Sequence, residues 1–289
     1  MDTKIVRYIL CRMLGVEAAL LLVPVLVAVI YQEKCGIVFL IPIVILCLLF
    51  WVVGRKRPEH GQIYGKEGMV IVALAWILWS LFGAMPFTLS GYIPSYVDAF
   101  FETVSGFTTT GSSIIPDVEV LPHCLLFWRS FTHWIGGMGV LVFVLVVTSL
   151  DRKNSMHLMR AEVPGPEKDK LVPKAMSTAR ILYGMYLTLT VIEMVFLVIG
   201  GMNLFDSMIF SFGSAGTGGF SNYADSVAHF NSAYIDGVIT VFCALFGVNF
   251  ALFYFMILGD FKSILKNEEL RTYICLLYTS PSPRDMRRS

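Results

Sequence analysis

A run of hydroxyl residues ending in glycine, Phe107-Thr-Thr-Thr-Gly111, interrupts a chain otherwise built from long apolar segments. Such a run forms a poor membrane helix, and polar non-helical backbone is tolerated at membrane depth only where protein buries it or water reaches it. The segment 95–107 before it is shorter than the roughly 20 residues that cross a bilayer core. The sequence therefore predicts a short re-entrant helix over 95–107 that stops midway and continues into a loop.

The same pattern occurs twice in the chain. Gly111 and Gly219 each lie thirteen positions after an aspartate, and at this offset Thr109 corresponds to Thr217. An apolar segment precedes each copy and another follows it. One such loop alone would be interpreted as an ordinary Ser/Thr surface loop, but the recurrence predicts a repeated unit of span, short helix, loop and span.

The composition is that of an integral membrane protein. Hydrophobic residues make up 56% of the 289 residues and charged residues only 15%, whereas a soluble domain carries about 25% charged residues. The net charge of +1 gives no indication of a nucleic-acid partner. The six cysteines are scattered without CxxC or Cys/His ligand spacing, so neither a disulfide framework nor a zinc site is predicted.

The basic loops determine the predicted topology. Lysine and arginine gather in the segments 1–12, 54–67 and 151–180, and the positive-inside rule places such segments in the cytoplasm. All loops then agree with a cytoplasmic N-terminus, six spans and two re-entrant segments. The predicted spans are 14–30, 37–53, 68–89, 123–150, 181–201 and 233–258, and the second re-entrant helix covers 205–215.

The predicted fold class is an all-α membrane protein with two N-terminal transmembrane helices followed by two helix–pore-loop–helix repeats. The predicted regions are an N-terminal two-helix region 1–67, a first span–loop–span repeat 68–150, a cytoplasmic linker 151–180, a second repeat 181–260, the start of a further unit 261–275 and a foreign or disordered tail 276–289.

The two loops are the candidate ion-binding segments. A half-helix that ends at the membrane centre presents about half a negative charge there, and backbone carbonyls can replace the hydration shell of a potassium ion. Neither loop contains an acidic residue, so carbonyl coordination is favoured over a ring of carboxylates. The residues predicted to bind potassium in a selectivity filter, through their backbone carbonyls, are Thr108, Thr109, Thr110, Gly111, Gly216, Thr217, Gly218 and Gly219.

Other polar residues within the apolar segments have two interpretations each. Glu102 and Glu193 are expected at membrane depth, where they either support a loop from behind or line the ion path. Arg129 and His133, one helical turn apart, either anchor the external end of their span or form a proton or gating switch. Asn249 is expected to form an interhelical hydrogen bond.

Three motifs resemble a known family. They are Phe107-Thr-Thr-Thr-Gly111, the block Trp128-Arg-Ser…Trp134-Ile-Gly-Gly-Met-Gly139, and Gly218-Gly-Phe-Ser221. Together they resemble the Trk/Ktr/HKT potassium transporters, most closely the bacterial TrkH members, over about residues 1 to 272. The glycines of the second motif are expected to let its helix pack closely or bend.

The resemblance carries expectations about function. Members of this family take up potassium across the cell membrane, and four span–loop–span units surround one pore, each with a key glycine that here would be Gly111 or Gly219. The resemblance also implies a homodimer and a cytoplasmic nucleotide-binding regulatory subunit of the TrkA type. Potassium is the transported ion, no other cofactor is implied, and the chain is not expected to be an enzyme.

The chain departs from the family pattern because only two of the four units are present. We therefore expect a fragment of a longer transporter. The alternative is a short two-repeat cation channel subunit that completes its pore by dimerisation. An intramembrane enzyme is disfavoured because the sequence contains neither HExxH nor GxSxG. An inverted-repeat transporter is disfavoured because both units begin inside and run in the same direction.

Overall fold

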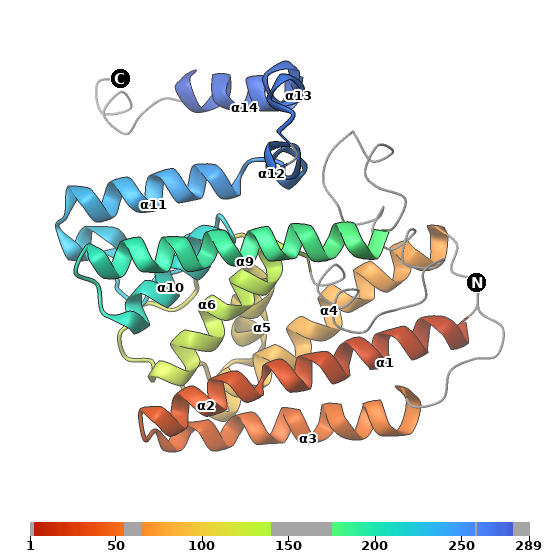
Figure 1. The fold of residues 1–289 in the computed structure, drawn as a ribbon. Helices are drawn as coiled ribbons and strands as arrows, with labels where there is room; N and C mark the ends of the chain where they lie inside the picture. The colour runs from red at the N-terminus through yellow and green to blue at the C-terminus, as the bar shows by residue number, and fades with distance from the viewer. Residues whose placement is uncertain (1–2, 55–64, 140–174, 258, 280–289) are drawn as a thin grey trace.

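The computed structural model describes residues 3–54, 65–139, 175–257 and 259–279, and every regular element in these ranges is helical (Figure 1). The all-α prediction is therefore confirmed for the described residues. Most of the predicted basic loops 54–67 and 151–180 lies outside them, as residues 55–64 and 151–174, and so does the end of the predicted tail, 280–289.

The N-terminal region is a helical hairpin packed against the next helix. Its elements are α1 (Thr3–Leu20), α2 (Leu22–Ile30), the 3-10 turn η1 (Lys34–Phe39), α3 (Leu40–Leu49) and the π-helical turn η2 (Phe50–Gly54), and it is followed by α4 (Gly65–Leu89). The helix begins at Thr3 and not near residue 14, because its first turns are amphipathic, with Ile5 and Val6 buried and Arg7 exposed. The break before α2 is explained by Pro24, which lacks the amide proton that would continue the helix.

Two short helices occupy the predicted re-entrant positions. These are α5 (Tyr96–Phe107) and α10 (Leu204–Ala215). The Ser95 side chain accepts a hydrogen bond from the Asp98 amide, and the Asn203 side chain accepts one from the Asp206 amide. Both helices thus begin with the same N-cap geometry, 108 positions apart in the chain. The two predicted short helices are confirmed within one residue at their N-terminal ends.

Helix α6 (His123–Gly137) is the most deeply buried element of the described chain. Every residue from Cys124 to Gly136 is buried, and the helix packs against α5, α10 and α2. A single span over 123–150 was predicted, but the helix ends at Gly137, and Gly139 has a φ of +74°. A left-handed glycine just past the last turn is a common helix terminator. Residues 140–174 are not described.

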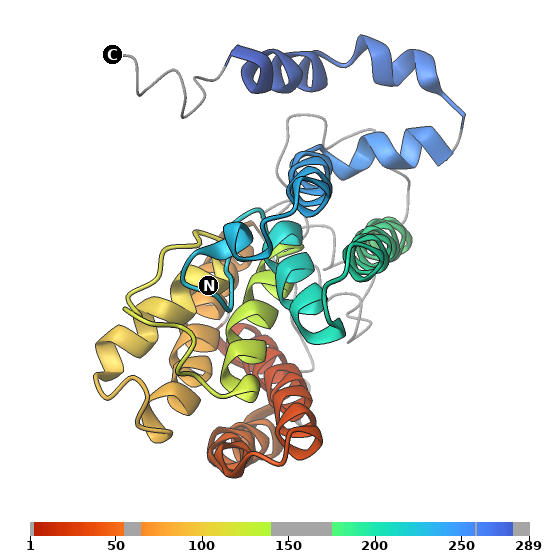
Figure 2. The same cartoon turned by 90° about the vertical axis from the view of Figure 1, so that its left-hand side faces the viewer.

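The C-terminal part leads away from the N-terminal hairpin (Figures 1 and 2). It consists of α9 (Ala175–Ile199), the 3-10 turn η3 (Ser226–Phe230), α11 (Ala233–Phe246), α12 (Phe250–Ile257), α13 (Phe261–Lys266) and α14 (Glu268–Thr279). The predicted span over 233–258 is not one straight helix, because α11 and α12 are bent by 90° at their junction.

Helix α14 stabilises this bend. The Tyr273 hydroxyl donates a hydrogen bond to the Ala244 carbonyl (3.0 Å), one of the unpaired carbonyls at the end of α11. The Asn249 side chain accepts a bond from the Ala251 amide (3.0 Å) at the start of α12 and donates one to Glu269 (3.0 Å). The predicted interhelical hydrogen bond of Asn249 is therefore confirmed, although it holds a bend.

Four described helical segments are long and apolar enough to cross a membrane, or five if the bent pair counts as one span. Six spans were predicted. The predicted span 123–150 is not among the segments that qualify, because α6 has only 15 residues and residues 140–150 lie outside the described ranges.

Candidate ion-binding loops

Each short helix continues into a loop with the same backbone conformation. We call residues 108–111 the first loop and residues 216–219 the second loop. Thr109 and Gly111 have φ values of +56° and +77°, and Thr217 and Gly219 have +57° and +78°. Left-handed φ is rare for threonine, so its occurrence at both corresponding positions indicates that the surrounding structure imposes one particular loop shape.

The hydrogen bonds that form this shape recur in register. The amides of Thr108, Thr109 and Thr110 donate to the carbonyls of Val104, Gly106 and Ser105, and the amides of Gly216, Thr217 and Gly218 donate to Phe212, Ser214 and Gly213. Every amide in the second set lies 108 positions after its counterpart, and so does every carbonyl. The loop amides thus turn back onto the ends of α5 and α10.

The loop carbonyls are left free. Among the hydrogen bonds formed by described residues, none is accepted by a carbonyl of residues 108–111 or 216–219. Of these eight residues only Gly216 is buried, and the others are partly or fully exposed, so the unpaired carbonyls of the two adjacent loops form an accessible acceptor surface for water, an ion or further protein. Backbone carbonyl oxygens can replace the hydration shell of a cation.

The two loops touch each other. A Cβ built on Gly111 would overlap the carbonyl oxygen of Gly218 and lie 2.7 Å from its carbonyl carbon, and one built on Gly218 would lie 2.8 Å from the Thr109 carbonyl oxygen. Real Cβ atoms do not approach other atoms within 3.0 Å. A Cβ on Gly219 would meet nothing within 4 Å. Glycine is therefore required at 111 and 218 by close approach, and at 219 only by its backbone conformation.

Helix α6 lies directly behind both loops. A Cβ on Gly136 would lie 2.9 Å from the carbonyl carbon of Phe107, and one on Gly137 would lie 2.9 Å from the carbonyl oxygen of Ala215. The predicted close packing of these glycines is thereby confirmed. His133, fully buried, stands against the second loop and packs on the Phe220 ring at a centroid distance of 4.1 Å. Within the described structure, neither of its ring nitrogens has a hydrogen-bond partner.

Arg129 and Glu102 form a buried ion pair behind the loops. Arg129 Nε lies 2.5 Å from Glu102 Oε1, and the two side chains are 4% and 0% exposed. The supporting position expected for Glu102 is thus observed. Arg129 was expected to anchor the end of its span, or to act as a switch with His133. Instead it reaches the second repeat, where Arg129 Nη1 donates to the Ser221 carbonyl (2.8 Å).

Two other carboxyl groups are fully buried. Glu193 on α9 is 0% exposed, as expected for a residue at membrane depth, and Glu17 on α1 is also 0% exposed. In the part of the chain that the structure describes, neither carboxyl has a hydrogen-bond partner. The sequence analysis missed Glu17, although an acidic residue within an apolar run was the available signal.

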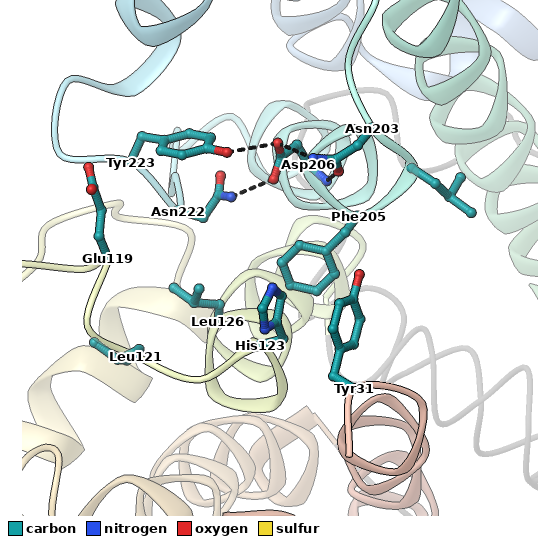
Figure 3. Close-up of a pocket in the computed structure, with 11 residues that line it drawn as sticks. Tyr31, Glu119, Leu121, His123, Leu126, Asn203, Phe205, Asp206, Asn222 and Tyr223 are labelled. Atoms are coloured by element: carbon teal, nitrogen blue, oxygen red, sulfur yellow. Dashed lines mark hydrogen bonds between the residues drawn. The ribbon is translucent and has the colours of Figure 1, made fainter. Parts of the chain in front are cut away.

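A cavity of about 510 Å³ lies beside the N-terminal ends of α6 and α10 (Figure 3). The Tyr31 and His123 rings stack directly on each other in its wall, with centroids 4.0 Å apart, and Phe205 meets both rings edge-on. Asp206 accepts hydrogen bonds from Asn222 (2.6 Å) and from the Tyr223 hydroxyl (2.9 Å; Figure 3). Burial and the hydrogen bond to Asp206 raise the pKa of Tyr223 to about 12.

Glu33 joins the N-terminal hairpin to α6 next to this cavity. Its carboxylate accepts hydrogen bonds from the backbone amides of His123 (2.7 Å) and Cys124 (3.0 Å), and so caps the helix from another part of the chain. Burial alone raises the pKa of Glu33, but the hydrogen bonds from Cys124 and His123 outweigh it, and the net pKa is lowered. This contact could not be predicted from the sequence, because the partners lie 90 positions apart.

Comparison with known proteins identifies the family. The TrkH family, described as cation transport protein, matches residues 36–278. The chain is 35% identical over 266 residues to the Trk system potassium uptake protein TrkH of Escherichia coli (strain K12), covering 90% of this chain and 54% of that protein. It is 34% identical over 260 residues to the Trk system potassium uptake protein TrkG of the same strain, covering 89% and 54%.

A solved structure agrees. The crystal structure of the potassium transporter TrkH from Vibrio parahaemolyticus matches with a TM-score of 0.80 and 29% identity, over 96% of this chain and 57% of that chain. The chain thus spans about half the length of the relatives it matches, and its fold is that of an all-α membrane protein. Since the family match covers most of the chain, this protein belongs to the TrkH family of cation transport proteins.

Proposed function

We propose that this chain forms one half of a potassium uptake pathway across the cell membrane, with the carbonyls of the first and second loops coordinating the ion. The observation that carries the proposal is the set of eight loop carbonyls without a hydrogen-bond donor among the described residues. The relatives named above are potassium uptake proteins.

The loop geometry supports carbonyl coordination. Helices α5 and α10 end at the two loops, and a helix C-terminus carries about half a negative charge, which favours a cation beside it. The left-handed backbone at Thr109, Gly111, Thr217 and Gly219 recurs in both loops, so both present their carbonyls in the same way. Since no carboxylate lies in either loop, selection would depend on carbonyl number and spacing.

The proposed assembly extends beyond this chain. Two further loops, supplied by the remainder of a longer protein, would complete the ion-coordinating ring. The complete transporter would be a homodimer in the cytoplasmic membrane, with a cytoplasmic N-terminus and a nucleotide-binding regulatory subunit of the TrkA type. The name of the Trk system in the relatives and the basic segments of the sequence support this assignment. The chain would have no enzymatic activity.

A chimera tests the proposal. Residues 1–272 replace the matching half of the Escherichia coli TrkH, and the chimera is expressed in a bacterium that lacks potassium uptake systems. We expect growth on limiting potassium, and we expect Gly111→Ser to lower potassium uptake relative to sodium, because a side chain there pushes the two loops apart. A chimera that is inserted in the membrane and takes up no potassium would refute the proposal.

The alternative, a two-repeat subunit that completes its pore by dimerisation, is tested with the chain alone. We expect this chain to be inserted in the membrane but not to restore growth, because an ion held on two sides recovers too little of its hydration energy. Growth supported by the chain alone would favour the two-repeat dimer over the fragment.

A further inference from the structure

We infer that Arg129 is a positioning residue that ties the second loop to the first short helix and thereby sets how well the pathway distinguishes potassium from sodium. The inference rests on the proposed function of the two loops. Arg129 is on α6, its ion-pair partner Glu102 is on α5, and its other polar partner, the Ser221 carbonyl, follows the second loop. The side chain thus joins two repeated units that are far apart in sequence.

The Arg129 guanidinium group makes three contacts at the same time. Its Nε meets Glu102 at 2.5 Å, its Nη1 donates to the Ser221 carbonyl at 2.8 Å, and its plane lies over the Phe220 ring with Cζ 3.7 Å from the centroid. A planar group with several fixed donors suits this arrangement, whereas the ammonium group of lysine is a compact point charge. The position therefore requires arginine and not simply a positive charge.

Glu102 extends the connection to the first loop. Its carboxylate also accepts hydrogen bonds from the Ser113 hydroxyl (3.0 Å) and the Ile114 amide (2.9 Å). Ser113 and Ile114 follow the first loop closely, as Ser221 follows the second. The segment that follows the first loop is thus bonded to Glu102, and the segment that follows the second loop is bonded to Arg129. A displacement of either side chain would change the distance between the carbonyls of the first loop and those of the second loop.

The connection has no symmetrical counterpart. The positions that correspond to Glu102 and Arg129 at the 108-residue offset are Phe210 and Gly237, which cannot form an ion pair. Within the described ranges, the Arg129–Glu102 pair is therefore the buried ion pair that joins the two repeated units. Burying two charges is costly unless they are paired and hydrogen-bonded, and here Arg129 Nε pairs with Glu102 while Arg129 Nη1 donates to the Ser221 carbonyl.

The decisive variant is Arg129→Lys, in the chimera with the Escherichia coli TrkH half. Lysine keeps the charge next to Glu102 but lacks the planar fork whose second nitrogen donates to the Ser221 carbonyl and whose face covers Phe220. We expect protein yield and maximal potassium uptake to change little. The KM for potassium should rise, and the preference for potassium over sodium should fall, each by about tenfold, as expected for loss of one charge-assisted hydrogen bond.

Two further variants complete the experiment. The double variant Glu102→Gln with Arg129→Gln leaves no unpaired buried charge, so it keeps the test valid if Arg129→Lys does not fold, and it should show the same loss of preference. Tyr96→Phe is the matched control, because it also removes a tertiary hydrogen bond of α5, from the Tyr96 hydroxyl to the Leu81 carbonyl (2.7 Å), but it does not touch the second loop. It should leave ion preference unchanged.

The outcomes separate the inference from the proposed function. If the unmodified chimera prefers potassium and Arg129→Lys and the double variant retain that preference, the positioning role is refuted while the proposed function stands. If Tyr96→Phe loses preference as strongly as Arg129→Lys, the effect is general destabilisation and the inference is also refuted. If the unmodified chimera does not distinguish the two ions, the proposed function fails, and the inference fails with it.

Discussion

Gly111 and Gly219 form a natural pair for testing how the two loops are built. Both have nearly the same left-handed φ, +77° and +78°, so an alanine at either position has the same backbone cost, about 1–2 kcal/mol. They differ in their surroundings, because a Cβ at 111 overlaps the Gly218 carbonyl whereas a Cβ at 219 meets nothing within 4 Å. Overpacking adds about 1–3 kcal/mol.

We therefore expect Gly219→Ala to lower the free energy of unfolding by about 1–2 kcal/mol and Gly111→Ala by about 2–5 kcal/mol, since strain and overlap add. The measurement is the loss of folded protein on heating in detergent, compared with the unmodified chain and with Gly237→Ala, a helical glycine with no atom within 4 Å of its Cβ. Equal destabilisation by Gly111→Ala and Gly219→Ala would show that the two loops are not in contact.

Two more predictions concern contacts that hold α6 in place. Glu33→Gln should cost about 1 kcal/mol at neutral pH, as loss of a helix cap does. Because the pKa of Glu33 is lowered in the folded protein, its stabilisation is present above the ordinary carboxyl pKa and is lost as the pH falls through the lowered value. Thermal melts of the two proteins should converge in acid, and a constant difference would contradict the cap. Trp128→Phe removes the buried hydrogen bond from the indole to the Gly83 carbonyl (2.9 Å); it should cost about 1–3 kcal/mol, and unchanged melting would contradict this role.

The short helices and loops were predictable because their causes are local. Ser95 and Asn203 are good N-caps at the expected distance before each loop, and the hydroxyl or glycine residues that follow cannot continue a membrane helix. The loop backbone then repeats because the same local hydrogen bonds repeat. The ion-coordinating role of these loops stays a prediction, because it concerns a ligand and not a backbone.

The features that were not predictable depend on distant residues. The bend after Phe246 exists because Tyr273 and Glu269 satisfy groups on either side of it, and an apolar stretch alone resembles a continuous span. Arg129 resembles a residue at the end of a span until its partners are known, since Glu102 and Ser221 lie 27 and 92 positions away. Pairing of this kind is a property of the tertiary structure.

The burial of α6 explains why the two repeats and the N-terminal hairpin belong to one structure. This helix carries Arg129, Ser130, Thr132 and His133 on successive faces, and all four are buried. A helix with polar groups on several sides cannot face lipid, because unsatisfied groups there cost several kcal/mol each. It must therefore be enclosed, and α5, α10 and α2 enclose it. The N-terminal hairpin also contacts α6 through the Glu33 cap. Removing the hairpin would therefore expose the helix that packs behind both loops.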